Sequence, residues 1–164
     1  MRHGCDISNY TTLDQYRAAY LRTTFDFVCI GLQNPAKARD FKSLITGNGT
    51  GKVPEFQYYV DLPGRDLSIA SPNEWVWIDI ERGAFEDAQA VRDQGTANTA
   101  AGLQTAIYCN KTSIQPVFGD SHELADWPCP LIYAGYRPPD FGTFQPFNGW
   151  ASPAAWQYSS QGMR

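Results

Sequence analysis

The stretch NEWVWIDIERGAFE, residues 73–86, combines an apolar, strand-like centre with two carboxylates. Its Trp, Val and Ile residues favour a buried or half-buried β-strand, which we expect over residues 75–81. Asp79 and Glu81 lie two positions apart, so on a strand they share one face while the isoleucines share the other. Carboxylates in such a run are costly unless they are paired, hydrogen-bonded or used chemically. The pair is therefore either structural, satisfied by backbone N–H groups or a nearby arginine, or catalytic.

A third acid follows the first strand of the chain. GCDIS, residues 4–8, puts Asp6 at the end of a short strand, with Cys5 and Ile7 on the opposite face. In an α/β barrel the catalytic groups lie at the carboxyl ends of the strands, so Asp6 and the later pair would converge there. The alternative is that Asp6 is an N-cap or a turn residue, because a Ser-Asn pair follows it.

Strand-like and helix-like segments alternate through the first two thirds of the chain, which indicates parallel βα units. We expect strands at 4–8, 25–32, 56–62, 75–81, 103–110, 129–136 and 154–160, and helices at 11–23, 35–46 and 84–94. A turn is expected at 47–52, a loop at 63–73 and irregular structure at 137–153. A standard barrel needs about 250 residues. The 164 residues therefore predict a single compact β/α barrel in the α/β class, TIM-barrel-like but with fewer helices in the last third, and one domain over residues 1–164.

Composition excludes several classes of function. With 43% apolar and 18% charged residues the chain is globular. A net charge of −4 and no basic run argue against a nucleic-acid partner. No apolar stretch is long enough to span a bilayer, so no membrane insertion is expected. The start, MRHGCDISNY, has no apolar core of a signal peptide, so the protein is made without a leader or the leader was removed before this numbering, and we expect a monomer.

No cofactor or metal is expected. The four cysteines form no C-x-x-C pair, and the chain has only two histidines, so a zinc site is not indicated.

The ordered set of motifs resembles glycoside hydrolase family 25 lysozymes. It consists of G-x-D-x-S at 4–8, D-x-E at 79–81 and W-Q-Y-S-S at 156–160, with LQTAIYC and LIYAGY resembling two further strands of the family. This resemblance covers most of the chain. It implies a barrel of five βα units and three plainer strands that cleaves the β-1,4 bond between N-acetylmuramic acid and N-acetylglucosamine. The partner would be bacterial peptidoglycan, and the missing leader suits a phage-encoded endolysin released from the host cytoplasm through a separate pore.

The resemblance also implies roles for the acids. Glu81 would be the general acid, kept protonated by apolar walls and neighbouring carboxyl groups. Asp79 would stay ionised and orient the acetamido group of the substrate, and Asp6 would hydrogen-bond Glu81 or the sugar. Aromatic residues that could line the sugar groove, each equally suited to the core, are Tyr58, Tyr108, Tyr136 and Trp156.

Departures from the family pattern keep two alternatives open. LQNPAK replaces the usual T-E-G after the second strand, Tyr59 stands where His is common, and no Asp follows the W-Q-Y-S-S motif before Arg164. These departures would suit a non-catalytic wall-binding or virion structural module on the same barrel. A chitinase-like enzyme also ends its motif in D-x-E, but it needs acids where this chain has Trp75 and Trp77.

The cysteines give a first testable prediction. Cys109 ends one expected strand and Cys129 begins the next, so in a parallel barrel they lie at opposite rims, beyond the Cα separation that a disulfide tolerates. We expect no disulfide among Cys5, Cys29, Cys109 and Cys129. Thiol titration in denaturant should find four free thiols per chain, and a smaller number would contradict this.

Overall fold

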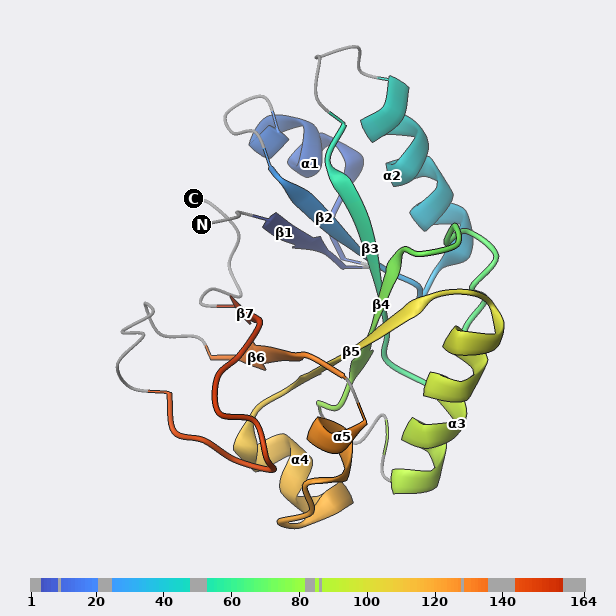
Figure 1. Cartoon of the computed structure of the whole chain (residues 1–164). Helices are drawn as coiled ribbons and strands as arrows, with labels where there is room; N and C mark the ends of the chain where they lie inside the picture. Colours follow the sequence, from blue (N-terminus) through green and yellow to red (C-terminus); the bar gives the residue numbers. More distant parts are fainter. Residues whose placement is uncertain are drawn as a thin grey trace.

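Seven strands and five helices make up the described part of the chain in the computed structural model (Figure 1). The structure describes residues 4–8, 10–20, 25–47, 53–81, 85, 87–127, 129–135 and 144–157. In chain order the elements are β1 (Gly4–Ile7), α1 (Leu13–Tyr20), β2 (Phe27–Gly31), α2 (Pro35–Gly47), β3 (Glu55–Val60), β4 (Trp75–Asp79), α3 (Ala88–Ala100), β5 (Gln104–Cys109), α4 (Lys111–Phe118), α5 (Glu123–Asp126), β6 (Leu131–Ala134) and β7 (Ala155–Gln157).

The strands form one parallel sheet in sequence order, β1 to β7, so the predicted parallel α/β class is confirmed. The predicted closed barrel is not seen. The sheet curls into a half-barrel, and among the described residues β1 pairs only with β2 and β7 only with β6 (Figure 1). The last two strands have four and three residues, which leaves little backbone for a ladder between β7 and β1.

Side-chain caps set the starts of the first three helices. At α1, Thr12 Oγ1 accepts from Gln15 N at 3.1 Å, and Gln15 Oε1 accepts from Thr12 N at 2.8 Å, which is a reciprocal capping box. Asn34 Oδ1 accepts from Lys37 N at 3.1 Å, just before the proline that opens α2. Asp87 caps α3, so this helix runs over 88–100 and not over the expected 84–94.

Helices α4 and α5 were not predicted. Pro116 lies inside α4, and a proline within eight residues argues against a helix in sequence reasoning. The helix forms because Asn110 and Ser113 make a capping box at its start. Parts of other predicted segments, residues 21–23, 48–52, 84, 86, 136–143 and 158–160, lie outside the described residues.

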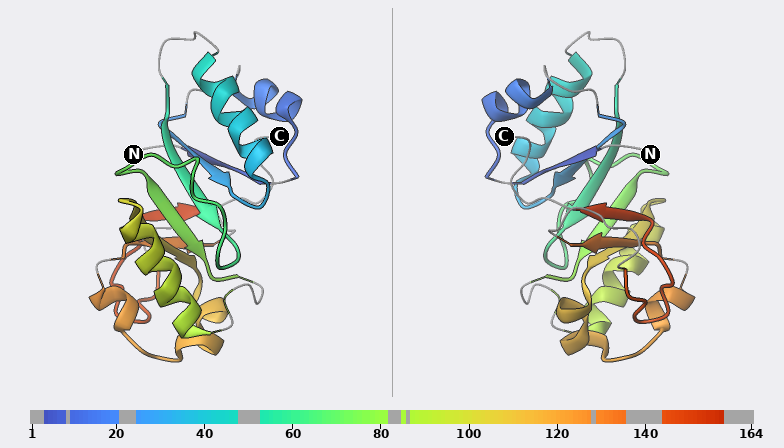
Figure 2. Two further views of the ribbon diagram at one scale, coloured as in Figure 1. Left: turned by 90° about the vertical axis from the view of Figure 1, so that its right-hand side faces the viewer. Right: turned by 90° about the vertical axis from the view of Figure 1, so that its left-hand side faces the viewer.

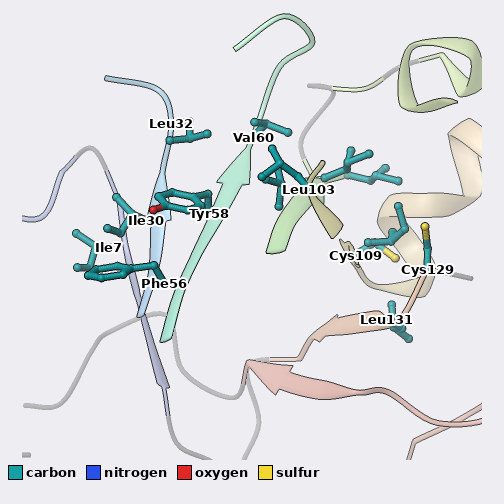
Figure 3. Close-up of a cluster of buried hydrophobic side chains, with 14 of the residues drawn as sticks. Ile7, Ile30, Leu32, Phe56, Tyr58, Val60, Leu103, Cys109, Cys129 and Leu131 are labelled. Carbon is teal, nitrogen blue, oxygen red and sulfur yellow. The ribbon is translucent and has the colours of Figure 1, made fainter. Parts of the chain in front are cut away.

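The main core lies between the sheet and the helices, which cover one face of the sheet (Figure 2). Alternate strand residues point into it, and Figure 3 shows several of them, including Ile7, Ile30, Phe56, Tyr58 and Val60, in one apolar cluster. All four cysteines are free, which confirms the absence of disulfides in the structure.

A glycine marks the contact between α3 and the segment after α5. A Cβ at Gly95 would lie 1.8 Å from Cη2 of Trp127, so the indole packs directly on the helix backbone. Gly47, at the end of α2, has no atom within 4 Å of the corresponding position.

These two glycines give a matched stability prediction. Gly→Ala inside a helix gains up to about 1 kcal/mol in propensity, but overpacking costs about 1–3 kcal/mol. Gly95→Ala should therefore lower the free energy of unfolding in urea by up to about 2 kcal/mol, which is the larger overpacking cost less the gain in propensity. Gly47→Ala is the control and should not lower it. Equal behaviour of the two variants would contradict the packing of Trp127.

Candidate active site

The face of the sheet opposite the helices, here called the inner face, carries its own cluster of strand residues. Its buried members come from four strands and are Cys29, Trp77, Ala106, Tyr108, Ile132 and Ala134. Phe27, Tyr59, Trp75 and Ala155 pack against them and are partly buried. The concave side of the half-barrel is therefore mainly apolar and aromatic.

The two carboxylates of the quoted stretch lie on this inner face. Asp79 ends β4, and by alternation it shares the face of Trp77, while Ile78 and Ile80 are 0% and 3% exposed in the helix-side core. Asp79 is half-buried, and its Oδ1 is shielded from solvent. Glu81 follows β4 directly and is also half-buried.

Asn110, which follows the neighbouring strand β5, hydrogen-bonds Glu81. Its Oε1 accepts a hydrogen bond from Asn110 Nδ2 at 3.4 Å. The amide of Asn110 is itself oriented, because its Oδ1 caps α4 by accepting from Ser113 N at 2.9 Å. The start of α4 thus fixes the donor that faces Glu81.

Asp6 approaches the same region from β1. Ile7 is 2% exposed in the helix-side core, so Asp6 points to the inner face. The charges of Asp6 and Asp79 both contribute, after burial, to raising the pKa of the Cys29 thiol and of the Tyr59 hydroxyl. The two carboxylates therefore share neighbours on β2 and β3. The reading of Asp6 as a helix cap or turn residue is wrong, since it lies within a strand.

The pKa of Asp6 is raised, chiefly by desolvation, although its side chain retains solvent access. Hydrogen bonds from its own backbone N–H and from the Gln157 side chain act in the opposite direction, because they favour the ionised form. A raised pKa in the folded state means that ionising Asp6 costs stability as the pH rises through that pKa. Such a cost is expected of a functional group more than of a structural one.

Two of the aromatic residues expected in a sugar groove lie elsewhere. Tyr58 is fully buried in the helix-side core, beside Ile30 and Phe56 (Figure 3), where its hydroxyl accepts from Lys42 Nζ at 2.7 Å. Its neighbour in sequence, Tyr59, is the one on the inner face.

Trp156 also lies off the inner face. It packs edge-on against Tyr133 at 4.9 Å between ring centroids, and its Nε1 donates to the carbonyl of Gly135 at 2.9 Å. By strand alternation it therefore points away from the inner face. Tyr136 lies outside the described residues.

Tyr108 is on the inner face, as expected of a groove residue. Its ring stacks on Trp77 with centroids 6.3 Å apart and an angle of 12° between the planes. Its hydroxyl donates a hydrogen bond to Oε1 of Gln157. In sheet register Tyr108 stands beside Asp79, so it connects the carboxylate region with β7.

Sequence reasoning missed three polar partners of the acids: Asn110, Gln157 and Tyr59. Each comes at or near the carboxyl end of a strand, which is the signal that could have identified them. Gln157 also stands inside the W-Q-Y-S-S motif.

No group of three or more His, Cys, Asp or Glu side chains in the described part of the chain is arranged to hold a metal ion. In the same residues no helix has the length and apolar character to cross a membrane. The inner face presents carboxyl, amide, phenol and thiol groups, from Asp79, Gln157, Tyr108 and Cys29 among others.

Comparison with known proteins shows a similarity to a lysozyme. The chain is 26% identical to "Probable GH family 25 lysozyme 2" of Dictyostelium discoideum over 187 residues, which covers 97% of this chain and 84% of that protein. No protein-family model matches the chain, and no solved structure matches it. The similarity agrees with the resemblance that the ordered motifs predicted.

The double role of Asn110 can be separated by mutation. Asn110→Ala removes the cap of α4 and should lower the free energy of unfolding by about 1 kcal/mol. Asn110→Ser keeps a good capping side chain but loses the amide that faces Glu81, so its stability in urea should stay near that of the wild type. An equal loss of stability in both variants would show that Asn110 does not stabilise the helix as a cap.

Proposed function

We propose that this chain, a divergent relative of the glycoside hydrolase family 25 lysozymes, is a peptidoglycan hydrolase whose inner face holds the catalytic acids. The observation that carries the proposal is that Asp6 in β1 and Asp79 at the end of β4 both lie on the inner face, while Glu81 follows Asp79 on the same face. Acids from two strands in an apolar, aromatic concavity suit a glycosidase, which needs a proton donor and a second negative group.

The bond we propose is the β-1,4 linkage from N-acetylmuramic acid to N-acetylglucosamine. Glu81 donates its proton to the glycosidic oxygen as the bond to the anomeric carbon breaks, and the leaving sugar departs with that proton. Asp79 stays ionised and orients the acetamido group, whose oxygen attacks the anomeric carbon. Water then opens the cyclic intermediate and returns a proton to Glu81. Asp6 completes the acidic cluster.

The aromatic residues of the inner face would bind the sugar rings. Tyr59 is partly buried there, near the carboxyl end of β3, and presents ring surface, which packs well on the apolar face of a pyranose. Tyr59 takes the place in this proposal that sequence reasoning had assigned to Tyr58. We further propose that residues 1–164 act as one catalytic domain, as a monomer, in the lysis of bacterial walls, as a phage endolysin would.

Mass spectrometry of fragments released from purified peptidoglycan tests both activity and bond. A muramidase releases fragments whose reducing end is N-acetylmuramic acid. Fragments ending in reducing N-acetylglucosamine would contradict the proposed bond. Release of no fragment, together with co-sedimentation of the protein with the wall, would replace the enzyme by the wall-binding module.

Glu81→Gln gives the sharpest catalytic prediction. The substitution keeps the shape and removes the transferable proton, and general acid catalysis contributes about 10²–10⁴-fold. Fragment release should therefore fall by at least about 10²-fold, with the melting temperature nearly unchanged. Glu55→Gln is the matched control, because Glu55 lies at the amino end of β3, whereas Glu81 follows the carboxyl end of β4. This variant should cleave like the wild type. Equal cleavage by Glu81→Gln and the wild type would overturn the assignment.

A further inference from the structure

The register of β4 and β5 places Glu81 beside Asn110. Asp79 of β4 stands opposite Tyr108 of β5, and Ile80 N donates to the Tyr108 carbonyl at 2.9 Å, so the pairing of the two strands continues past the end of β4. Two residues beyond that pair, Glu81 and Asn110 are neighbours on the inner face. Asn110 Nδ2 donates to Glu81 Oε1 at 3.4 Å, and both side chains are half-buried.

The cap of α4 determines which end of the Asn110 amide faces Glu81. Helix α4 follows β5 directly (Figure 1), and Asn110 Oδ1 accepts from Ser113 N at 2.9 Å. A backbone N–H can only donate, so the carbonyl end of the amide faces the helix and the NH₂ end is left for Glu81. Ser113 Oγ in turn accepts from Asn110 N at 3.0 Å, which completes the capping box. The group that faces Glu81 is therefore a donor held in place by the helix.

This donor acts differently on the two protonation states of Glu81. In the protonated acid the carbonyl oxygen is the better acceptor, so an NH₂ group at Oε1 favours the arrangement in which Oε2 carries the proton. In the carboxylate, the same N–H group bonds a charged oxygen, and the hydrogen bond becomes stronger. The contact therefore selects the oxygen from which the proton leaves and stabilises the charge that remains.

We propose that Asn110 is a positioning residue for the general acid: its amide, oriented by the cap of α4, keeps the transferable proton on Oε2 of Glu81 and stabilises the carboxylate that forms when this proton leaves. In the cleavage step the Oε2–H bond breaks and its electron pair stays on Glu81. The proton passes to the glycosidic oxygen, which takes the electron pair of its bond to the anomeric carbon. This catalytic part rests on the proposed function, whereas the hydrogen bond itself does not.

The charged and titratable groups around Glu81 define how its titration can be read. Asp79 lies on the same strand and face, Cys109 ends β5, the exposed Lys111 begins α4, and Asp6 lies three strands away in β1. Burial, and then the charges of Glu81 and Asp79, raise the pKa of the Cys109 thiol, which therefore stays neutral in acid and near neutrality. Asp79 and Glu81 can titrate as a coupled pair, so the carboxyl carbons of both have to be followed.

NMR on the intact wild-type chain tests the hydrogen bond. The side-chain NH₂ protons of Asn110, assigned by their loss in Asn110→Ser, should shift as the Glu81 carboxyl group titrates, because their acceptor gains a full charge. The NH₂ protons and the Glu81 carboxyl carbon should give the same midpoint, and the NH₂ shift at this midpoint should be absent in Glu81→Gln. An NH₂ resonance that does not follow the Glu81 carboxyl carbon would overturn the proposal.

Two variants keep the cap and change the group that faces Glu81. Asn110→Ser removes the donor and Asn110→Asp replaces it by a carboxylate, while serine and aspartate are both good N-caps. The midpoint of the Glu81 titration should move to higher pH in Asn110→Ser, because the ionised form loses a hydrogen bond, and further in Asn110→Asp, because a like charge is added. An unchanged midpoint in both variants would also overturn the proposal.

Asn34→Ser is the matched control for these variants. Asn34 caps α2 by accepting from Lys37 N at 3.1 Å, and it follows β2, two strands away from β4. The same exchange of asparagine for serine at a helix cap is thus made away from Glu81, and the Glu81 midpoint should not move. A midpoint that moves equally in Asn34→Ser and Asn110→Ser would show that the effect does not pass through the Asn110 amide, and would overturn the proposal.

Kinetics separate this inference from the proposed function. If the wild type cleaves peptidoglycan, its rate should fall at pH values above the Glu81 midpoint, because the general acid must be protonated. In Asn110→Ser this alkaline limb should move to higher pH, and the rate below it should fall by about fivefold to tenfold, which is the worth of one hydrogen bond. Asn34→Ser should keep both the limb and the rate.

Two outcomes count against different parts of the argument. A limb and a rate that both stay in place in Asn110→Ser, despite a moved Glu81 midpoint, would overturn the catalytic part of the role. A wild type that cleaves nothing fails the proposed function and that catalytic part, while the NMR titration still decides the hydrogen bond.

Discussion

Alternation of side chains along β4 is the constraint on which the rest of the site depends. Ile78 and Ile80 are driven into the helix-side core, and a buried isoleucine contributes about 1.5–3 kcal/mol relative to an exposed one. That burial leaves Asp79 and Glu81 with one direction only, towards the inner face. A slip of one residue would put both carboxylates into the apolar core. The same anchoring holds Asp6, because Ile7 is fixed on the helix side of β1.

Much of this arrangement could be predicted from the sequence, because it depends on the spacing of residues within short segments. Two-residue spacing predicted a shared face for Asp79 and Glu81, and the alternation of strands and helices predicted the parallel sheet. The choice between Tyr58 and Tyr59 could not be made in this way. Tyr58 is buried and Tyr59 is partly buried, and a tyrosine side chain suits either environment, so the residue type does not reveal which of the two lies on the inner face.

Contacts between segments that are distant in the sequence could not be predicted either. Gln157 contacts Tyr108 across 49 positions of sequence, and no local pattern encodes that contact. The acids could thus be named from the sequence, whereas the amides that orient them came from the three-dimensional arrangement.

The buried thiols have a consequence for where such a protein can work. Burial raises the pKa of Cys5 to about 12 and that of Cys129 to about 11, and the thiols of Cys29 and Cys109 are raised further with help from the inner-face carboxylates. Oxidation and thiol exchange proceed through the thiolate, which these shifts suppress. The chain therefore has little chemical sensitivity to the redox state of its medium, and its fold can pass between reducing and oxidising surroundings without gaining or losing a covalent bond.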